Sequence, residues 1–337
     1  MSEASPTTRK RQPPHLPTSD RLDHAGGKMP THRLAIRKHL GGPTMSPADL
    51  TMSFLVREDG EEPGKRPMPT FTIAELVEAV RVLDDLGVRS GKFFAGSRLR
   101  DDRATQAASP TGLMARAIKA VKKARPDFTI VTENCVCSHN KSGECWLPNA
   151  VGDIDAEETK KVIAAQAVTQ AEAGADIIGP ASMIPGSVKA VREALNAAGH
   201  RGALLMPHLI FDSDLYGGYR ATMGAAPASG TRAFQLDPYR PEEAVKVAMD
   251  MVEEGADAIL LEPALFTVDT LVTLKKKLDV PLMPFSVSGE YIRLTERRSD
   301  GTLYVRPLAE SYTVLKRSGA DRIITYAARE IAEYVTA

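Results

Sequence analysis

Three cysteines lie close together in the middle of the chain, and the sequence contains no others. Cys135, Cys137 and Cys145 are spaced so that their thiolates can converge on one cation if the loop between them folds back. Three protein ligands and one open position are typical of a catalytic zinc site, whereas a structural site is usually closed by four ligands. The polar loop favours such a site over the alternative, three unconnected buried thiols. His139 in this loop is either a fourth ligand or a solvated histidine.

Groups suited to proton transfer stand near the ends of two predicted strands. Glu262 ends one apolar run, and a carboxylate near a metal in a partly apolar cavity is a candidate general base or acid. The alternative is that Glu262 only pairs with a substrate ammonium or with Arg220. His208 and Asp212 flank Ile210 at alternate positions, so all three share one strand face if the strand continues that far. His208 is then either an acid–base catalyst or a hydrogen-bonded strand histidine.

Short apolar runs alternate with helical patterns over most of the chain, and these elements must position the reactive groups. The runs are continuously apolar, as expected for parallel strands buried on both faces. Strands are predicted over residues 52–57, 92–96, 128–133, 176–180, 203–208, 258–262, 282–287 and 322–326. Helices are predicted over residues 73–86, 112–124, 156–173, 187–198, 241–254, 268–278, 308–318 and 329–335.

The junctions between helix and strand repeat one phrase, Gly-Ala-Asp, which begins at Gly174, Gly255 and Gly319. Glycine at this place provides the left-handed cap that turns the chain toward the next strand. Eight strands with intervening helices match a closed barrel, and the first strand lacks the glycine-rich phosphate loop of an open doubly wound sheet. The sequence therefore predicts an α/β fold, a (β/α)8 TIM barrel with chemistry at the carboxyl ends of its strands.

Composition narrows the class of protein. The chain has 337 residues, and its 43 basic side chains balance its 43 acidic ones, which argues against a broad nucleic-acid surface. The apolar runs are too short for a membrane helix and the N-terminus lacks a secretory signal, so a cytoplasmic protein is predicted. We expect a flexible segment over residues 1–30, an extended oligomerisation arm over 31–50, and the barrel over 51–337.

Several longer motifs resemble the porphobilinogen synthase family, also called 5-aminolevulinate dehydratase, from about Arg33 onward. Besides the cysteine loop they are Tyr-Gly-Gly-Tyr-Arg from Tyr216, Phe-Gln-Leu-Asp-Pro from Phe234, Val-Ser-Gly-Glu-Tyr from Val287, and Gly-Ala-Asp-Arg-Ile-Ile-Thr-Tyr from Gly319. The resemblance implies a TIM barrel whose N-terminal arm builds homo-oligomers, octamers or smaller even assemblies. It also implies a lyase that joins two molecules of 5-aminolevulinate into a pyrrole.

The resemblance assigns roles to residues that this sequence retains. It places Zn²⁺ on the three cysteines. Ser288 and Tyr326 match residues that bind one substrate carboxylate, and Arg220 matches a residue that binds the other substrate. Tyr216 and Gln235 stand in the same motifs and are further candidates for substrate binding.

The two lysines that form Schiff bases in the family are missing here. Ile210 and Glu262 stand at their positions, and neither can form an imine because that reaction needs a nucleophilic amine. Most lysines fall on predicted helical faces. Only Lys141 and Lys189 lie near catalytic-face loops, and neither ends a strand, so a displaced Schiff-base lysine is not expected.

The sequence retains the residues that match the metal ligands and the carboxylate-binding residues, but not the lysines. This pattern favours an enzyme with altered chemistry over a copy that has lost its function. We expect a zinc-dependent lyase or dehydratase that acts without Schiff bases on a small amino- or keto-substituted carboxylic acid, in specialised metabolism, with Glu262 moving the proton. Two alternatives stay open: an ordinary porphobilinogen synthase, and a non-catalytic binding partner of such a synthase.

Overall fold

The computed structural model describes residues 45–336, apart from 62–66, 229 and 231. The segment predicted to be flexible (1–30) and most of the predicted arm (31–50) lie outside the described residues. The last residues of the arm, from 45 onward, belong to the body of the barrel. There a short 3-10 helix, η1 (Pro47–Asp49), packs against the C-terminal helix α11 (Ala328–Thr336), and β1 (Leu50–Val56) follows directly.

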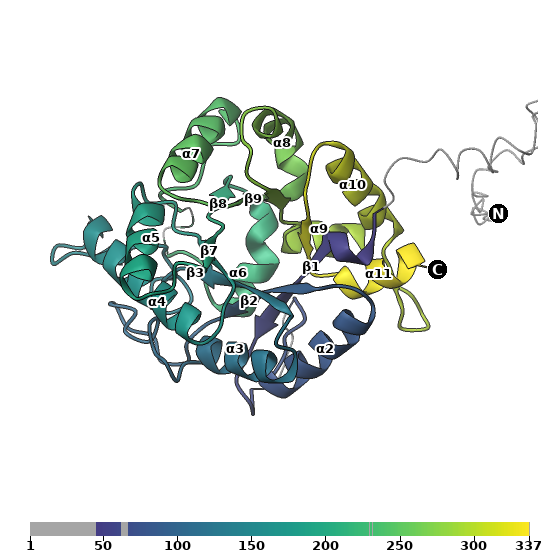
Figure 1. The fold of residues 1–337 in the computed structure, drawn as a ribbon, viewed down its shortest axis with the longest axis horizontal. Helices are drawn as coiled ribbons and strands as arrows, with labels where there is room; N and C mark the ends of the chain where they lie inside the picture. The colour runs from purple at the N-terminus through teal and green to yellow at the C-terminus, as the bar shows by residue number, and fades with distance from the viewer. Residues whose placement is uncertain (1–44, 62–66, 229, 231, 337) are drawn as a thin grey trace, which may run out of the picture. The chain divides into compact units, whose positions relative to one another are not determined.

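Parallel strands curl into a ring, and helices surround them (Figure 1). One sheet has the order β13 (Ile323–Thr325), β1, β2 (Ser90–Ala95), β3 (Thr129–Asn134), β6 (Ile177–Pro180) and β7 (Leu204–Leu205). A second has the order β10 (Leu282–Pro284), β9 (Ile259–Glu262) and β8 (His208–Ile210). The sheets meet at Met206 and Pro207, which separate β7 from β8, and at a bridge between Phe285 and Ile324. The predicted TIM barrel is confirmed.

The outer helices lie where the sequence predicts them. They are α2 (Ile73–Asp85), α3 (Leu113–Ala124), α4 (Ala156–Glu172), α5 (Ser187–Ala197), α7 (Pro241–Glu253), α8 (Val268–Lys275) and α10 (Arg306–Arg317). Side-chain caps fix the starts of α2 and α4: Thr72 accepts from the Glu75 amide, and the Asp155 carboxylate accepts from the Glu158 amide at 2.9 Å. Within the described part of the chain, no helix has both the length and the apolar surface to cross a membrane.

The repeated Gly-Ala-Asp junction connects an outer helix with neighbouring strands through the contacts of its glycine and its aspartate. Gly174, Gly255 and Gly319 have φ between 107° and 110°, which only glycine adopts without strain. The aspartate two residues later accepts from a backbone amide of a neighbouring strand at 2.7–2.8 Å and pairs with a basic side chain from an outer helix. The stem of that basic residue packs over the glycine, where a Cβ would lie 2.8–3.3 Å from its Cγ. The repetition therefore reflects a common packing requirement.

Several short elements at the carboxyl face are not predicted from the sequence. They are the hairpins β4 (Leu147–Pro148) with β5 (Ile154–Asp155) and β11 (Glu296–Arg297) with β12 (Leu303–Tyr304), the 3-10 helices η2 (Asp214–Tyr216) and η3 (Ala264–Thr267), and the helices α6 (Gly217–Met223) and α9 (Ser288–Leu294). Helices α6 and α9 pack together, and the Tyr219 amide donates to Ser288 Oγ at 3.0 Å. Each has only seven residues, too few for a clear helical period.

Candidate active site

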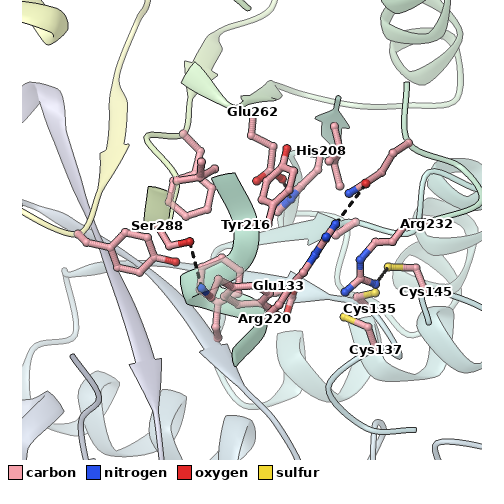
Figure 2. Close-up of a pocket in the computed structure, with 18 residues that line it drawn as sticks. Glu133, Cys135, Cys137, Cys145, His208, Tyr216, Arg220, Arg232, Glu262 and Ser288 are labelled. Atoms are coloured by element: carbon pink, nitrogen blue, oxygen red, sulfur yellow. Dashed lines mark hydrogen bonds and ion pairs between the residues drawn. The ribbon is translucent and has the colours of Figure 1, made fainter. Parts of the chain in front are cut away.

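A pocket lies at the carboxyl ends of the strands and gathers most of the residues singled out from the sequence (Figure 2). Strands β3, β8 and β9, the cysteine loop and the short helices α6 and α9 all contribute to its walls. The predicted site residues that line it are Cys135, Cys137, Cys145, His208, Tyr216, Arg220, Gln235, Glu262, Ser288 and Tyr326. Residues from distant parts of the sequence therefore form one site.

Asp212 is the exception among the predicted site residues. Strand β8 ends at Ile210, and the next residue, Phe211, bridges to Leu236 on a different segment. The Asp212 amide donates to the Leu236 carbonyl at 2.8 Å, and its side chain is exposed. The condition under which Asp212 would share a face with His208 and Ile210 is therefore not met, because the chain turns to pair with Leu236. Asp212 is not among the residues that line the pocket.

The cysteine loop folds back as its spacing predicts. All three sulfur ligand atoms are buried and lie within 4.8 Å of one another. Asn140 closes the loop, since its side chain donates to the Glu144 carbonyl and accepts from the Gly143 amide, both at 2.8 Å. A buried, convergent set of three sulfurs fits a thiophilic ion such as Zn²⁺ and leaves a position for another ligand.

Arg232 supplies positive charge at this cluster, and Figure 2 shows its guanidinium pointing at the sulfurs. Its Nη1 donates to Cys145 Sγ at 2.6 Å. Hydrogen bonds from Cys135 and Cys137 hold the pKa of the Cys145 thiol well below its usual range, and Arg232 lowers it further. A thiolate is the form that binds a metal, so this arrangement suits a metal site.

His139 is neither a ligand of this cluster nor a solvated loop residue, so both interpretations from the sequence are wrong. It is buried, and its Nδ1 lies 2.6 Å from Ser97 Oγ, while Gln166 Nε2 lies 3.2 Å from its Nε2. Burial lowers the pKa of His139 to about 4. A neutral imidazole with two partners therefore braces the base of the loop.

His208 and Glu262 form a hydrogen-bonded pair between adjacent strands, and Figure 2 shows their side chains close together. His208 Nδ1 lies 2.8 Å from Glu262 Oε1, and both side chains are buried. Burial raises the pKa of Glu262 to about 7, and Lys92, Arg232 and Arg220 oppose that rise. Burial also holds the pKa of His208 well below its usual range. A carboxyl group that titrates near neutrality is suited to proton transfer.

The residues predicted to bind substrate carboxylates, Ser288, Tyr326 and Arg220, also line the pocket. Ser288 Oγ donates to the Leu215 carbonyl at 3.0 Å, which anchors α9 to η2. The Arg220 guanidinium lies 5.3 Å from the centre of the Tyr216 ring. Its contact with Gln235, at 3.5 Å, is at the outer limit of a hydrogen bond. The protein itself therefore binds this guanidinium only weakly.

Sequence reasoning missed Lys92. This lysine lies on β2 with no exposed surface, and its Nζ donates to the Thr132 carbonyl at 3.1 Å. A signal was present, because Lys92 is the one charged residue in a buried strand, β2. Nothing in the sequence indicates the contact of Arg232 with Cys145.

Replacing Gly143 by alanine should destabilise the cysteine loop. Gly143 has φ of +69°, and a Cβ there would lie 2.2 Å from the Ala226 carbonyl oxygen. Strain and overlap together should cost about 2–4 kcal/mol in the free energy of unfolding. Gly152→Ala is the matched control, because Gly152 has φ of +93° and nothing within 4 Å of the added Cβ. Urea unfolding that gives equal losses for both variants would contradict the tight contact.

Comparisons with known proteins agree with one another. The family model described as delta-aminolevulinic acid dehydratase matches residues 28–334. The protein of that name from Bacillus subtilis strain 168 is 33% identical over 310 residues, which cover 89% of this chain and 95% of that protein. The one from Synechococcus elongatus is 32% identical over 324 residues, 91% and 99% of the two chains. The crystal structure of the Toxoplasma gondii ME49 enzyme, in complex with its reaction product porphobilinogen, is similar with a TM-score of 0.82 and 28% identity, and the match covers 92% of each chain.

Proposed function

Because the chain belongs to the delta-aminolevulinic acid dehydratase family, a family of lyases, we propose that it is a metal-dependent lyase of a small carboxylic acid. The proposed metal is Zn²⁺ on the three cysteines, and the proposed substrate carries an amino or keto group. The reaction proceeds without lysine Schiff bases at the two strand ends. The expected homo-oligomer and cytoplasmic location remain parts of this proposal.

One observation supports a reaction that differs from that of the family. Ile210 and Glu262 are register partners on β8 and β9, and both line the pocket. These are the positions that the resemblance gives to the two lysines. Ile210 has a hydrocarbon side chain, and Glu262 has a carboxylate that is hydrogen-bonded to His208. Neither has an amine that could attack a carbonyl carbon and form an imine. The proposed reaction therefore takes place at the same strand ends as in the family, but with different reactive groups.

The remaining residues suggest how the site would work. A metal ion on the three sulfurs would supply Lewis-acid stabilisation of a carbonyl oxygen or a hydroxide at neutral pH. Glu262, with its Oε1 on His208 Nδ1, would accept or return a proton. Arg220 would hold a substrate carboxylate by charge-assisted hydrogen bonds. Phe94 and Phe285, whose stacked rings lie 5.9 Å apart in the pocket wall, would exclude water.

Arg220→Met should weaken binding of carboxylic acids. Loss of a charge-assisted contact costs about 1.5–3 kcal/mol, which corresponds to a roughly 10- to 150-fold higher Kd. Calorimetric titration of a panel of small amino and keto acids measures this change. Arg240→Met is the control, since Arg240 pairs with Glu243 at 2.8 Å, is exposed and is not among the pocket-lining residues. Equal affinities in the Arg220 variant and the wild type would remove Arg220 from the binding site.

The proposed function is tested by metal analysis together with turnover. Protein purified without chelator should contain about one zinc per chain, and incubation with the acid panel should yield a product of water loss or bond cleavage, followed by mass spectrometry. No bound metal and no product from any acid would reject the proposal.

An ordinary porphobilinogen synthase is the second candidate, and the names of the relatives fit it at least as well. The buried Lys92 near the pocket is an observation in its favour, because a desolvated lysine can act as a nucleophile. Incubation with 5-aminolevulinate and borohydride tests it. A reduced lysine adduct together with a pyrrole product would establish this candidate. Absence of both would exclude it.

A further inference from the structure

Lys92 is a buried cation whose place in the barrel needs an explanation. Its side chain has no exposed surface, and its Nζ makes one hydrogen bond, to a carbonyl oxygen, and lies 5.1 Å from the centre of the Phe94 ring. No carboxylate oxygen of the described residues lies within 4 Å of this nitrogen. Burying an ammonium group without a contact ion pair is costly. Such a group is expected to interact with charges at slightly longer range.

Gly179 on β6 brings Lys92 and His208 together. A Cβ built on Gly179 would lie 3.1 Å from Lys92 Nζ and also 3.1 Å from His208 Nε2. The two nitrogens are therefore separated by at most twice that distance. The same Cβ would lie 2.6 Å from the Thr132 carbonyl oxygen, the acceptor of the Lys92 hydrogen bond. The missing side chain at residue 179 thus leaves room for both groups in the barrel interior.

The hydrogen bond of His208 to Glu262 determines which ring nitrogen carries the proton. His208 Nδ1 faces Glu262 Oε1 at 2.8 Å, so Nδ1 carries the proton when Glu262 is a carboxylate. A neutral imidazole then has a lone pair on Nε2, which is buried and has no hydrogen-bond partner among the described residues. Nε2 is the ring nitrogen that lies, with Lys92 Nζ, within 3.1 Å of the Cβ position at Gly179. The order of groups is therefore the ammonium of Lys92 on β2, the imidazole dipole of His208 on β8 and the carboxylate of Glu262 on β9.

We propose that Lys92 is a positioning residue, which acts through His208 to keep Glu262 a carboxylate bonded to His208 Nδ1 in the pocket. This role rests on the proposed function, in which Glu262 moves the proton. It also explains how an acid can occupy a strand end that holds a lysine in the family. A buried positive charge is present here too, but it belongs to Lys92 on β2, which does not line the pocket.

The charges around the pair agree with this role. After burial, which raises the pKa of Glu262 to about 7, Lys92 is the strongest group that lowers it. Burial and then Lys92 hold the pKa of His208 well below its usual range, so the ring stays neutral. Burial lowers the pKa of Lys92 to about 8, and the carboxylates of Glu133 and Glu262 oppose this. The other charged or titratable groups that act on Glu262 or feel its charge are Arg220, Arg232, Glu290, Tyr216 and Tyr326.

Infrared titration without substrate tests the proposal, so its outcome is separate from that of the proposed function. The carboxylic-acid band of Glu262 is identified as the band that disappears in Glu262→Gln. Because Lys92 favours the ionised form, Lys92→Met should raise the apparent proton affinity of Glu262 by about tenfold or more. Lys92→Arg should keep it close to the wild-type value. Lys119→Met, which removes the same charge from an exposed site on α3, should leave it unchanged.

Two results would overturn the proposal. One is an unchanged titration of Glu262 in Lys92→Met. The other is a borohydride-reduced adduct on Lys92 itself, which would make this lysine a nucleophile. If Lys92→Met does not fold, the double variant Lys92→Met/Glu262→Gln decides, because it removes both buried charges. Recovery of a folded double variant supports the coupling of the two groups, and failure to recover contradicts it.

Discussion

Replacing Cys135, Cys137 or Cys145 by serine is expected to abolish stoichiometric zinc binding and to lower turnover by about three orders of magnitude. The three sulfurs lie within 4.8 Å of one another, so losing one leaves two ligands where a zinc site normally needs three from the protein. A metal contributes several kcal/mol of transition-state stabilisation, and each 1.36 kcal/mol corresponds to a factor of ten in rate. The effect should be similar for all three cysteines.

Elemental analysis after gel filtration measures the metal, and circular dichroism checks that the barrel is folded. Lys141→Ala is the matched control, because the Lys141 side chain is exposed in the same loop and pairs with Asp102 at 4.0 Å. This variant should keep its metal and its activity. Full metal occupancy in any of the three serine variants would show that the sulfurs do not act as one site.

Glu262→Gln is expected to lower kcat by about 10²- to 10⁴-fold, the usual contribution of a positioned acid or base. Glutamine keeps the shape of the side chain and a hydrogen bond to His208 but cannot take up a proton. Burial raises the pKa of Glu262 to about 7, and a general base acts only in its ionised form. The wild-type rate should therefore rise with pH through about 7 and then level off, and this limb should disappear in the variant.

Asp212→Asn is the matched control for this prediction. Asp212 is a neighbouring acid that sequence reasoning also placed in the site, but it is exposed and does not line the pocket. Its kcat and pH profile should match those of the wild type. If Asp212→Asn loses as much activity as Glu262→Gln, the proton is moved elsewhere than the buried pair.

The barrel could be predicted from the sequence because its signals are local. Strands buried on both faces give short, continuous apolar runs, and each Gly-Ala-Asp junction fixes a turn within three residues. The cysteine loop is also local, since the ligands span eleven residues from Cys135 to Cys145. The seven-residue helices α6 and α9 were missed because they form on the barrel rather than through their own periodicity.

Whether β8 continues to Asp212 could not be predicted from the sequence for a related reason. Alternation along a strand says which residues share a face, but it does not say where pairing ends. The pairing of Phe211 with Leu236 decides that, and these residues meet only when the barrel has formed. The same holds for His139, whose partners Ser97 and Gln166 come from separate segments.

The sequence by itself determined the fold, the family, the three-cysteine cluster and the absence of a lysine at both strand ends, because residue type and short spacing are enough for each. Only the tertiary structure decided what replaces those lysines. Lys92, His208 and Glu262 come from three strands, and closure of the barrel brings them together in the interior beside a strand glycine. In that interior, burial shifts the pKa values of all three groups, and neither these shifts nor the long-range contacts can be read from a sequence pattern.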